Sequence, residues 1–161
     1  MELAHQKALD VYESRIKDNP AYQTEDCIVI GADTIVSYRG EILGKPADNE
    51  EAFDMLSMLA DRTHQVYTGV TFAGHISGKQ ILHTFYEKTD VTFYPVTKED
   101  LHTYVDSGDS LDKPALTASR RICHPRKGIE GDYNNVVGLP IARLYHELDS
   151  ILPKEKIHYA F

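Results

Sequence analysis

A short apolar run that passes directly into a small polar motif constrains the fold of this chain more than any other feature. Cys27-Ile28-Val29-Ile30 is wholly apolar and is typical of a strand in the interior of a sheet. Gly31-Ala32-Asp33-Thr34 follows at once. The sequence therefore predicts a carboxylate and a hydroxyl just beyond the carboxyl end of a buried strand, where α/β proteins bind ligands. Gly31 is expected to permit a tight backbone there.

Helices and strands are both predicted along the rest of the chain. Helical spacing of apolar side chains, with capping residues at Asp48 and Thr97, predicts helices over residues 2–17, 48–59, 97–105 and 139–148. Apolar or alternating runs predict strands over 35–38, 42–46, 65–73 and 80–94, with turns at 39–40 and 74–79. Helices mixed with hairpins indicate an α/β or α+β fold with a mixed sheet. The length of 161 residues fits one domain, 1–150, followed by a C-terminal tail, 151–161.

The composition excludes several classes of protein. With 25 acidic and 17 basic side chains the net charge is −8, which disfavours general binding to nucleic acid. No apolar run reaches the roughly 18 to 20 residues of a membrane span. The first residues lack the basic and apolar regions of a signal peptide. Cys27 and Cys123 are too few for a disulfide scaffold, so a cytoplasmic location is expected.

Lys45 adds a cation to the predicted site. It lies in Leu43-Gly44-Lys45-Pro46, on the predicted return strand of the hairpin that begins with the Asp33 strand. A carboxylate, a hydroxyl and an ammonium around a glycine-rich turn suit a polyphosphate carried with a divalent cation. In such a site Asp holds the metal or a water, and Lys neutralises phosphate oxygens. The residues alone leave an alternative open, because an Asp after a strand is more often a turn or cap residue.

A series of short motifs runs through nearly the whole chain. They are Ile-Gly-Ala-Asp-Thr-Ile-Val at 30–36, Leu-Gly-Lys-Pro at 43–46, Met-Leu at 55–56 with Leu59, His-Gln-Val-Tyr-Thr-Gly-Val at 64–70, and Ile-Glu-Gly-Asp-Tyr-Asn-Asn-Val-Val-Gly-Leu-Pro at 129–140. In this order they resemble the Maf family of nucleoside triphosphate pyrophosphatases. The resemblance implies an α/β sheet bent around a cleft between two lobes, with flanking helices. It also implies hydrolysis of the α–β phosphoanhydride of a nucleotide to the monophosphate and pyrophosphate, with Mg²⁺ or Mn²⁺.

The same resemblance implies roles for particular residues. Asp33 matches the catalytic Asp that activates water, and it is the candidate metal ligand. Thr34 matches a residue associated with base selection. Lys45 matches a phosphate-contacting Lys, and Lys7 looks like another. The Ala-Asp-Thr and Leu-Gly-Lys-Pro motifs are similar to those of the branch that acts on dTTP and UTP. A nucleoside triphosphate is therefore the expected binding partner. A homodimer is possible as the oligomeric state.

The chain departs from the family pattern in two places. Family members begin with a strand and a Ser-x-Ser-Pro-Arg-Arg loop ahead of the helix that here starts at Met1, so the chain is expected to lack both. After Asp112-Lys113 the family has Ala-Gly-Ala-Tyr-Gly-Ile-Gln-Gly, which residues 114–120 do not match. Codons can be chosen for Pro-Ala-Leu-Thr-Ala-Ser-Arg that also encode Ala-Gly-Ala-Tyr-Gly-Ile-Gln in another reading frame. That frame begins one base earlier, at the last base of the Lys113 codon. We therefore interpret 114–128 as the product of a frameshift or of a misplaced splice junction.

This interpretation accounts for residues that otherwise look functional. Arg120, Arg121, Arg126 and Lys127 form a basic run in an acidic chain, and Cys123-His124 is half of a metal motif without partners at zinc spacing. His64 is expected to be a hydrogen-bonded structural histidine beside the strand rather than a ligand. Two hypotheses remain: a nucleotide pyrophosphatase, or a catalytically impaired remnant that acts at most as a nucleotide-binding module.

Overall fold

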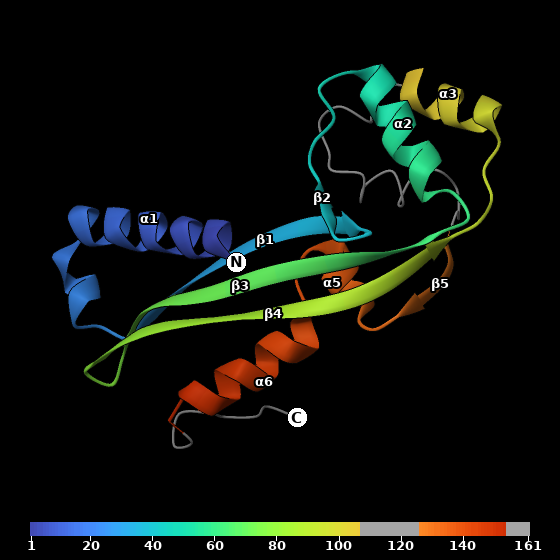
Figure 1. Ribbon diagram of the computed structural model, residues 1–161. Helices are drawn as coiled ribbons and strands as arrows, with labels where there is room; N and C mark the ends of the chain where they lie inside the picture. The colour runs from blue at the N-terminus through green and yellow to red at the C-terminus, as the bar shows by residue number, and fades with distance from the viewer. Residues whose placement is uncertain (107–125, 154–161) are drawn as a thin grey trace. The chain divides into compact units, whose positions relative to one another are not determined.

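The computed structural model describes residues 1–106 and 126–153 (Figure 1). Its elements are α1 (Glu2–Asp18), a 3-10 helix (Pro20–Gln23), β1 (Cys27–Tyr38), β2 (Glu41–Leu43), α2 (Asn49–Leu59), β3 (Thr63–Ile76), β4 (Lys79–Phe93), α3 (Lys98–Asp106), β5 (Arg126–Glu130), α5 (Tyr133–Val137) and α6 (Ile141–Ile151). The strands form a five-stranded sheet in the order β2-β1-β3-β4-β5. The β1–β2 and β4–β5 pairs are antiparallel. The sheet is antiparallel, which corrects the mixed sheet expected from the sequence. The α/β class with helices flanking a sheet is confirmed.

The chain divides into two compact units. Unit 1 comprises Met1–Asp33, Thr68–Glu87 and Val137–Phe161, and unit 2 comprises Thr34–Tyr67 and Lys88–Val136. Strands β1, β3 and β4 contribute residues to both units. Among the helices of the described residues, none combines the length and the apolar character that a transmembrane span requires.

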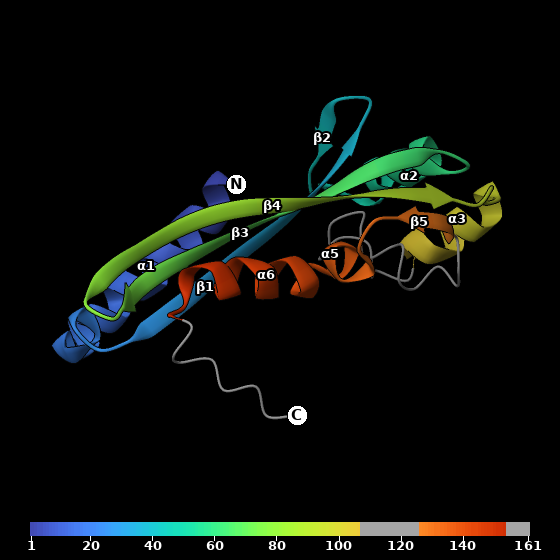
Figure 2. The same ribbon diagram turned by 90° about the horizontal axis from the view of Figure 1, so that it is seen from below.

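Unit 1 has α1 and α6 on opposite faces of its strands (Figures 1 and 2). Because side chains alternate along a strand, successive residues of β1 meet different helices. The α1 side holds a buried cluster of Ala8, Tyr12 and Ala73 with Cys27 and Val29 packed against it. The α6 side holds Val70, Phe72 and Phe85, with Ile28, Ala32, Leu144, Leu148 and Ile151 packed against them. Each helix therefore covers one set of alternate strand residues.

Strand β1 runs without a break through Gly31–Thr34, which corrects the expectation that a strand ends there. Gly31 is not among the glycines with positive φ, so its backbone does not require the turn conformation expected of it. Asp33 consequently lies within a strand rather than beyond one. Ile30, expected in the interior, is 45% exposed. An apolar run by itself does not distinguish a strand that is covered throughout from one that is covered in part.

The hairpin between β1 and β2 in unit 2 follows the predicted turn. Arg39 and Gly40 have φ values of 53° and 86°, and Tyr38 is paired with Glu41. Two successive residues with positive φ match the twist of the flanking strands, which is why a glycine is placed here. β2 then ends at Leu43, so Lys45 follows the strand instead of lying on it as expected.

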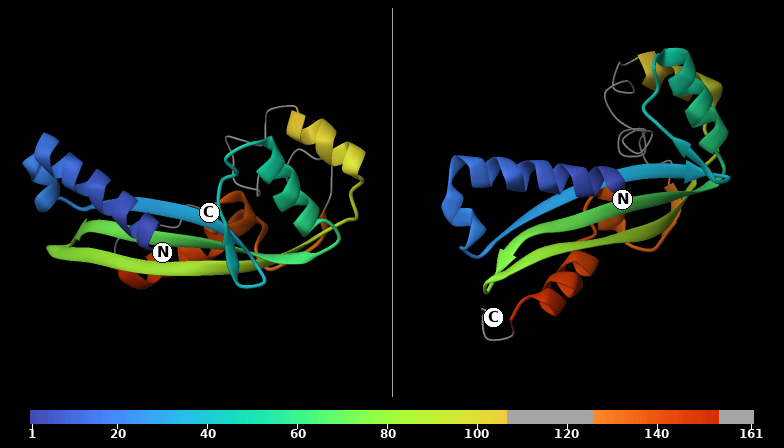
Figure 3. Two further views of the ribbon diagram at one scale, coloured as in Figure 1. Left: turned by 45° about the horizontal axis from the view of Figure 1, so that its top comes forward. Right: turned by 60° about the vertical axis from the view of Figure 1, so that its left-hand side comes forward.

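Helices α2 and α3 of unit 2 lie side by side (Figure 3). The capping residues are those predicted: the Asp48 carboxylate accepts a hydrogen bond from the Glu51 amide at 2.9 Å, and the Thr97 hydroxyl accepts one from the Asp100 amide at 3.1 Å. The apolar residues buried between the two helices are Ala52, Leu56, Leu101, Tyr104 and Val105.

Strand β5 and helix α5 were not predicted from the sequence. β5 begins at Arg126, inside the proposed frameshifted segment 114–128, and pairs with β4 through registers such as Val91 with Ile129. α5 is only five residues long, which is too short for a periodic signal. The rest of the proposed frameshift, including Cys123-His124, lies outside the described residues, as does the tail from residue 154.

His64 is buried in the core of unit 2, as expected of a structural histidine. It is 1% exposed, and its ring meets Phe93 edge-on with centroids 4.6 Å apart. Its Nδ1 atom is buried without a hydrogen-bond partner. Burial lowers the pKa of His64 from 6.5 to about 4, against an opposing attraction from Asp90. The imidazole is therefore neutral in the folded protein at pH 7.

Burial of neutral His64 is expected to make the fold sensitive to acid. The folded-state pKa lies below the unfolded value, so the unfolded state binds more protons between pH 6.5 and 4 and stability falls as the pH falls. From pH 7 to pH 5 the histidine is expected to cost about 2 kcal/mol of unfolding free energy. Urea titrations of wild type and His64→Phe at both pH values test this. An equal loss in both proteins would show that His64 is not responsible.

Candidate functional site

The candidate site of unit 1 is built around an ion pair between Asp33 and Lys7. The Lys7 Nζ donates to the Asp33 Oδ1 at 2.6 Å. The Asp33 side chain is 19% exposed and the Lys7 side chain is 56% exposed. The carboxylate is thus fixed on a strand, while the ammonium is on a flexible, accessible arm. Of the residues predicted to act together, the structure brings these two into contact.

Helix α1 delivers Lys7 because it lies unusually close to β1. A Cβ atom built on Gly31 would overlap the carbonyl oxygen of Ala4 and lie 2.7 Å from the Ala8 nitrogen. Ala4 and Ala8 are fully buried, so the helix meets the strand with its smallest side chains. Lys7 lies between these alanines in sequence. Asp33 follows Gly31 by two residues, so alternation places both on the α1 side of the strand.

Thr34 and Lys45, the other two predicted site residues, belong to unit 2. Thr34 is half-buried within β1, directly after Asp33. Lys45 is exposed in the segment between β2 and α2, where Gly44 has open space around its Cα atom. The roles of Thr34 and Lys45 in substrate binding stay predictions.

The described residues hold few groups for a metal ion. In the ranges 1–106 and 126–153 there is no cluster of three or more His, Cys, Asp or Glu side chains arranged for a metal. Mg²⁺ is commonly held in proteins by one or two carboxylates together with substrate phosphates and waters. A single carboxylate such as Asp33 fits that kind of site, and it does not fit a metal site built from protein ligands alone.

A second polar cluster of unit 1 fastens α6 to β4. The Glu147 carboxylate contacts His83 Nε2 at 2.7 Å and accepts from Arg143 Nε at 2.7 Å. The hydrogen bond with His83, followed by that with Arg143, holds the pKa of Glu147 below its usual range. His83 also lies against Phe72 and Phe85. These contacts stabilise the packing of α6 against β4. His83 and Glu147 are far apart in the chain, so no local pattern predicts their contact, whereas Arg143 and Glu147 are four residues apart on α6.

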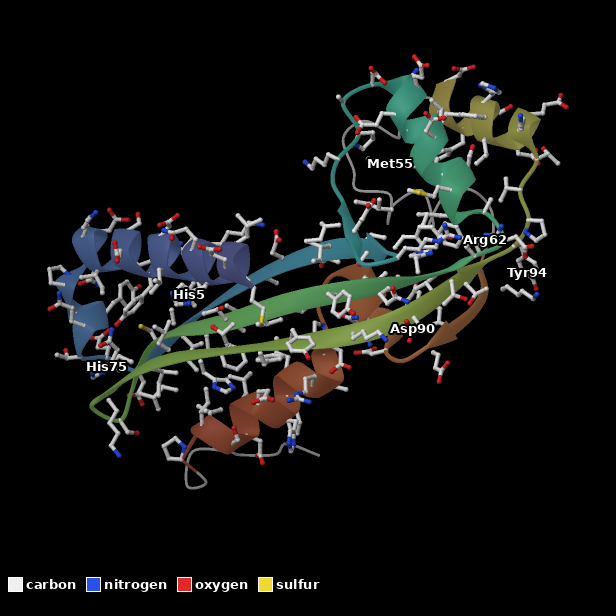
Figure 4. All side chains as sticks on the ribbon, in the orientation of Figure 1. His5, Met55, Arg62, His75, Asp90 and Tyr94 are labelled. Atoms are coloured by element: carbon white, nitrogen blue, oxygen red, sulfur yellow. The ribbon has the colours of Figure 1, made fainter. Side chains whose placement is uncertain are left out.

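A third polar cluster lies on β3 and β4 in unit 2, at Asp90, which Figure 4 labels. Burial raises the pKa of Asp90, but hydrogen bonds from Gln65 and Lys88 outweigh it and leave the pKa below the usual range. Gln65 Nε2 donates to Asp90 at 3.0 Å, and Lys88 Nζ lies 3.1 Å from it. Gln65 contacts Asp90 from the neighbouring strand, and Lys88 lies two residues from Asp90 on the same strand. Such contacts are ordinary within a sheet and stabilise it.

Comparison with known proteins identifies relatives along nearly the whole chain. Residues 1–151 match the family model described as Maf-like protein. A dTTP/UTP pyrophosphatase of Agathobacter rectalis is 50% identical over 154 residues, covering 92% of this chain and 75% of the relative. A dTTP/UTP pyrophosphatase of Bacillus cereus is 46% identical and one of Bacillus cytotoxicus is 44% identical, each covering 92% of this chain and 71% of the relative. The resemblance seen in the motifs is confirmed.

The Lys7–Asp33 pair is expected to contribute little to stability. Because the ammonium is more than half exposed, Lys7→Met should change the free energy of unfolding by less than about 1 kcal/mol. Lys17→Met, at an exposed position near the end of the same helix, is the control. Chemical denaturation of the three proteins measures the difference. A loss of several kcal/mol confined to Lys7→Met would make the pair a structural brace.

Proposed function

Because the chain belongs to the Maf-like family, we propose that it is a nucleoside triphosphate pyrophosphatase. It hydrolyses the α–β phosphoanhydride of nucleotides such as dTTP and UTP, the substrates named for its relatives. Water and the triphosphate give the monophosphate and pyrophosphate. The observation that carries the proposal is the pairing of Asp33 with Lys7, since it joins a proton acceptor to a cation that can bind phosphate.

In this proposal Asp33 is the general base. Its carboxylate accepts a proton from the attacking water as the water oxygen bonds to phosphorus and the bridging P–O bond breaks. The electron pair of that bond leaves with pyrophosphate, and the proton later passes to solvent. The strand holds the carboxylate in one place, which is the requirement for a base that acts on a bound substrate.

Lys7 neutralises charge on the phosphates. Its ammonium is exposed, so it can exchange the Asp33 oxygen for a phosphate oxygen when a nucleotide binds. That exchange leaves a lone pair of Asp33 available to water. Thr34 and Lys45 are proposed to contact the nucleotide as well, Thr34 toward the base and Lys45 toward the phosphates.

A divalent cation, Mg²⁺ or Mn²⁺, is proposed as the cofactor. Asp33 is the candidate ligand, with the substrate phosphates as the others, because the described residues contain no group of three or more His, Cys, Asp or Glu side chains that could hold a metal. When bound, the cation supplies charge neutralisation for the phosphates and the departing pyrophosphate. The protein side of the site then needs few cations of its own.

The expected single domain over 1–150 and the cytoplasmic location stay predictions.

The alternative of a non-catalytic remnant is not favoured. It was suggested by the expected loss of an N-terminal loop and of the segment at 114–120. The Asp33–Lys7 contact is nevertheless present with a distance of 2.6 Å, and both residues come from well-packed elements. The relatives, moreover, are named dTTP/UTP pyrophosphatases.

Release of pyrophosphate from dTTP and UTP, in the presence of Mn²⁺, tests the activity. Asp33→Asn keeps the shape but removes the proton acceptor, so kcat is expected to fall at least about 100-fold. Asp10→Asn is the matched control, since Asp10 is an exposed carboxylate of unit 1 that accepts a hydrogen bond from Gln6. A cooperatively folded wild-type protein that releases no pyrophosphate would favour the remnant, and equal rates in wild type and Asp33→Asn would refute the role of Asp33.

Lys45→Ala is expected to raise KM for dTTP about 10- to 100-fold, because a hydrogen bond between charged groups contributes about 1.5–3 kcal/mol. Lys98→Ala, another exposed lysine of unit 2, should leave KM unchanged. Steady-state kinetics of both variants decide the point. Similar KM values for the two would remove Lys45 from the substrate contacts.

A further inference from the structure

We propose that Gly31 is a positioning residue, which sets the separation of α1 from β1 so that Lys7 reaches Asp33. Gly31 has no side chain with which to touch a substrate, so it acts through its two neighbours in space. The inference deepens the proposed function and rests on it. It assigns to the glycine of the Gly-Ala-Asp-Thr motif a role different from the turn that the sequence suggested.

The contact at Gly31 is between backbones. An added Cβ would overlap the Ala4 carbonyl oxygen, and it would lie 2.7 Å from the Ala8 nitrogen and 2.8 Å from the Ala8 Cβ. Backbone atoms of a helix cannot rotate away as the end of a long side chain can. A methyl group at position 31 must therefore move α1 as a whole or bend β1.

Lys7 and Asp33 are attached to the two elements at the point of contact. Lys7 is next to Ala8 and three residues from Ala4, whereas Asp33 is two residues from Gly31 on the same face of β1. Moving α1 outward therefore moves the Lys7 backbone away from Asp33. A misplacement of about 1 Å in a catalytic arrangement can cost about 100-fold in rate.

Gly69 on β3 provides independent evidence that the start of α1 lies directly on the strands. A Cβ on Gly69 would lie 3.1 Å from the Met1 Cα atom, which a shift of a few tenths of an ångström relieves. The contact at Gly69 is thus milder than that at Gly31. Gly69→Ala should accordingly show the same effects as Gly31→Ala in weaker form.

Gly74 offers a matched control within unit 1. A Cβ on Gly74 would overlap the Cys27 carbonyl oxygen and lie 3.0 Å from the Ile28 Cα, so the steric conflict is as severe as at Gly31. This conflict is between β3 and β1, however, and not between α1 and β1. Figure 4 labels His75, the residue of β3 that follows Gly74, and His5 in the first turns of α1.

The test measures how much Lys7 contributes to kcat/KM in wild type, in Gly31→Ala and in Gly74→Ala. With Gly31 present, Lys7→Ala is expected to lower kcat/KM about tenfold or more, since it removes a charged phosphate contact. In the Gly31→Ala protein the same substitution should change kcat/KM less than about twofold, because Lys7 is already displaced. In the Gly74→Ala protein the full effect of Lys7→Ala should persist. If Lys7→Ala costs the same in all three backgrounds, or costs nothing in wild type, the positioning role is overturned.

Ala8→Ser provides a smaller change at the same contact if Gly31→Ala does not fold. It adds one oxygen on the helix side, opposite Gly31, and should reduce the Lys7 contribution by an intermediate amount. A full Lys7 contribution in a folded Ala8→Ser protein would count against the proposal.

Crystal structures of the variants separate this inference from the proposed function. If wild type releases no pyrophosphate, the proposed function fails, but the position of Lys7 can still be observed. The inference expects the 2.6 Å contact between Lys7 Nζ and Asp33 Oδ1 to be lost in Gly31→Ala and kept in Gly74→Ala. Retention of the contact in both variants would overturn it.

Discussion

The close contact of α1 with β1 is the constraint on which the candidate site depends. It requires a glycine at position 31 and fully buried alanines at positions 4 and 8. Larger residues in any of these places would separate the elements, and a longer side chain than lysine would then be needed to span the gap. Close packing in unit 1 is therefore a condition for the Lys7–Asp33 pair as well as for the stability of the fold.

Helix caps and turns are predictable from the sequence where they depend on a few adjacent residues. The caps at Asp48 and Thr97 and the turn at Arg39-Gly40 each depend on a few adjacent residues, and the structure contains all three. The structure differs from the prediction where a residue is constrained by a part of the chain distant in sequence. A glycine in a polar motif indicates a turn, whereas the actual constraint on Gly31 comes from Ala4 and Ala8 of α1, more than twenty residues earlier in the chain.

The candidate site was predictable in part. Asp33, Thr34, Lys45 and Lys7 were identified by resemblance, and the contact of Lys7 with Asp33 joins two of them. Nothing in the spacing of the residues could give that contact, since it depends on how α1 crosses β1. Asp90 is also a half-buried strand carboxylate, but its partners differ from those of Asp33. Asp90 is held by Gln65 on the neighbouring strand and by Lys88 on its own strand, whereas Asp33 is held by an accessible ammonium.

Charge explains why so exposed an ion pair suits the proposed reaction. The chain carries a net charge of −8 and would repel a nucleoside triphosphate at long range. Binding therefore has to come from local cations and from a divalent cation carried by the substrate, which reduces its charge. A buried lysine would stay paired with Asp33. A lysine that made no contact with Asp33 would leave the negative charge of the carboxylate unscreened. An exposed Lys7 avoids both outcomes, since it screens Asp33 until phosphates arrive and can then transfer to them at little cost in solvation.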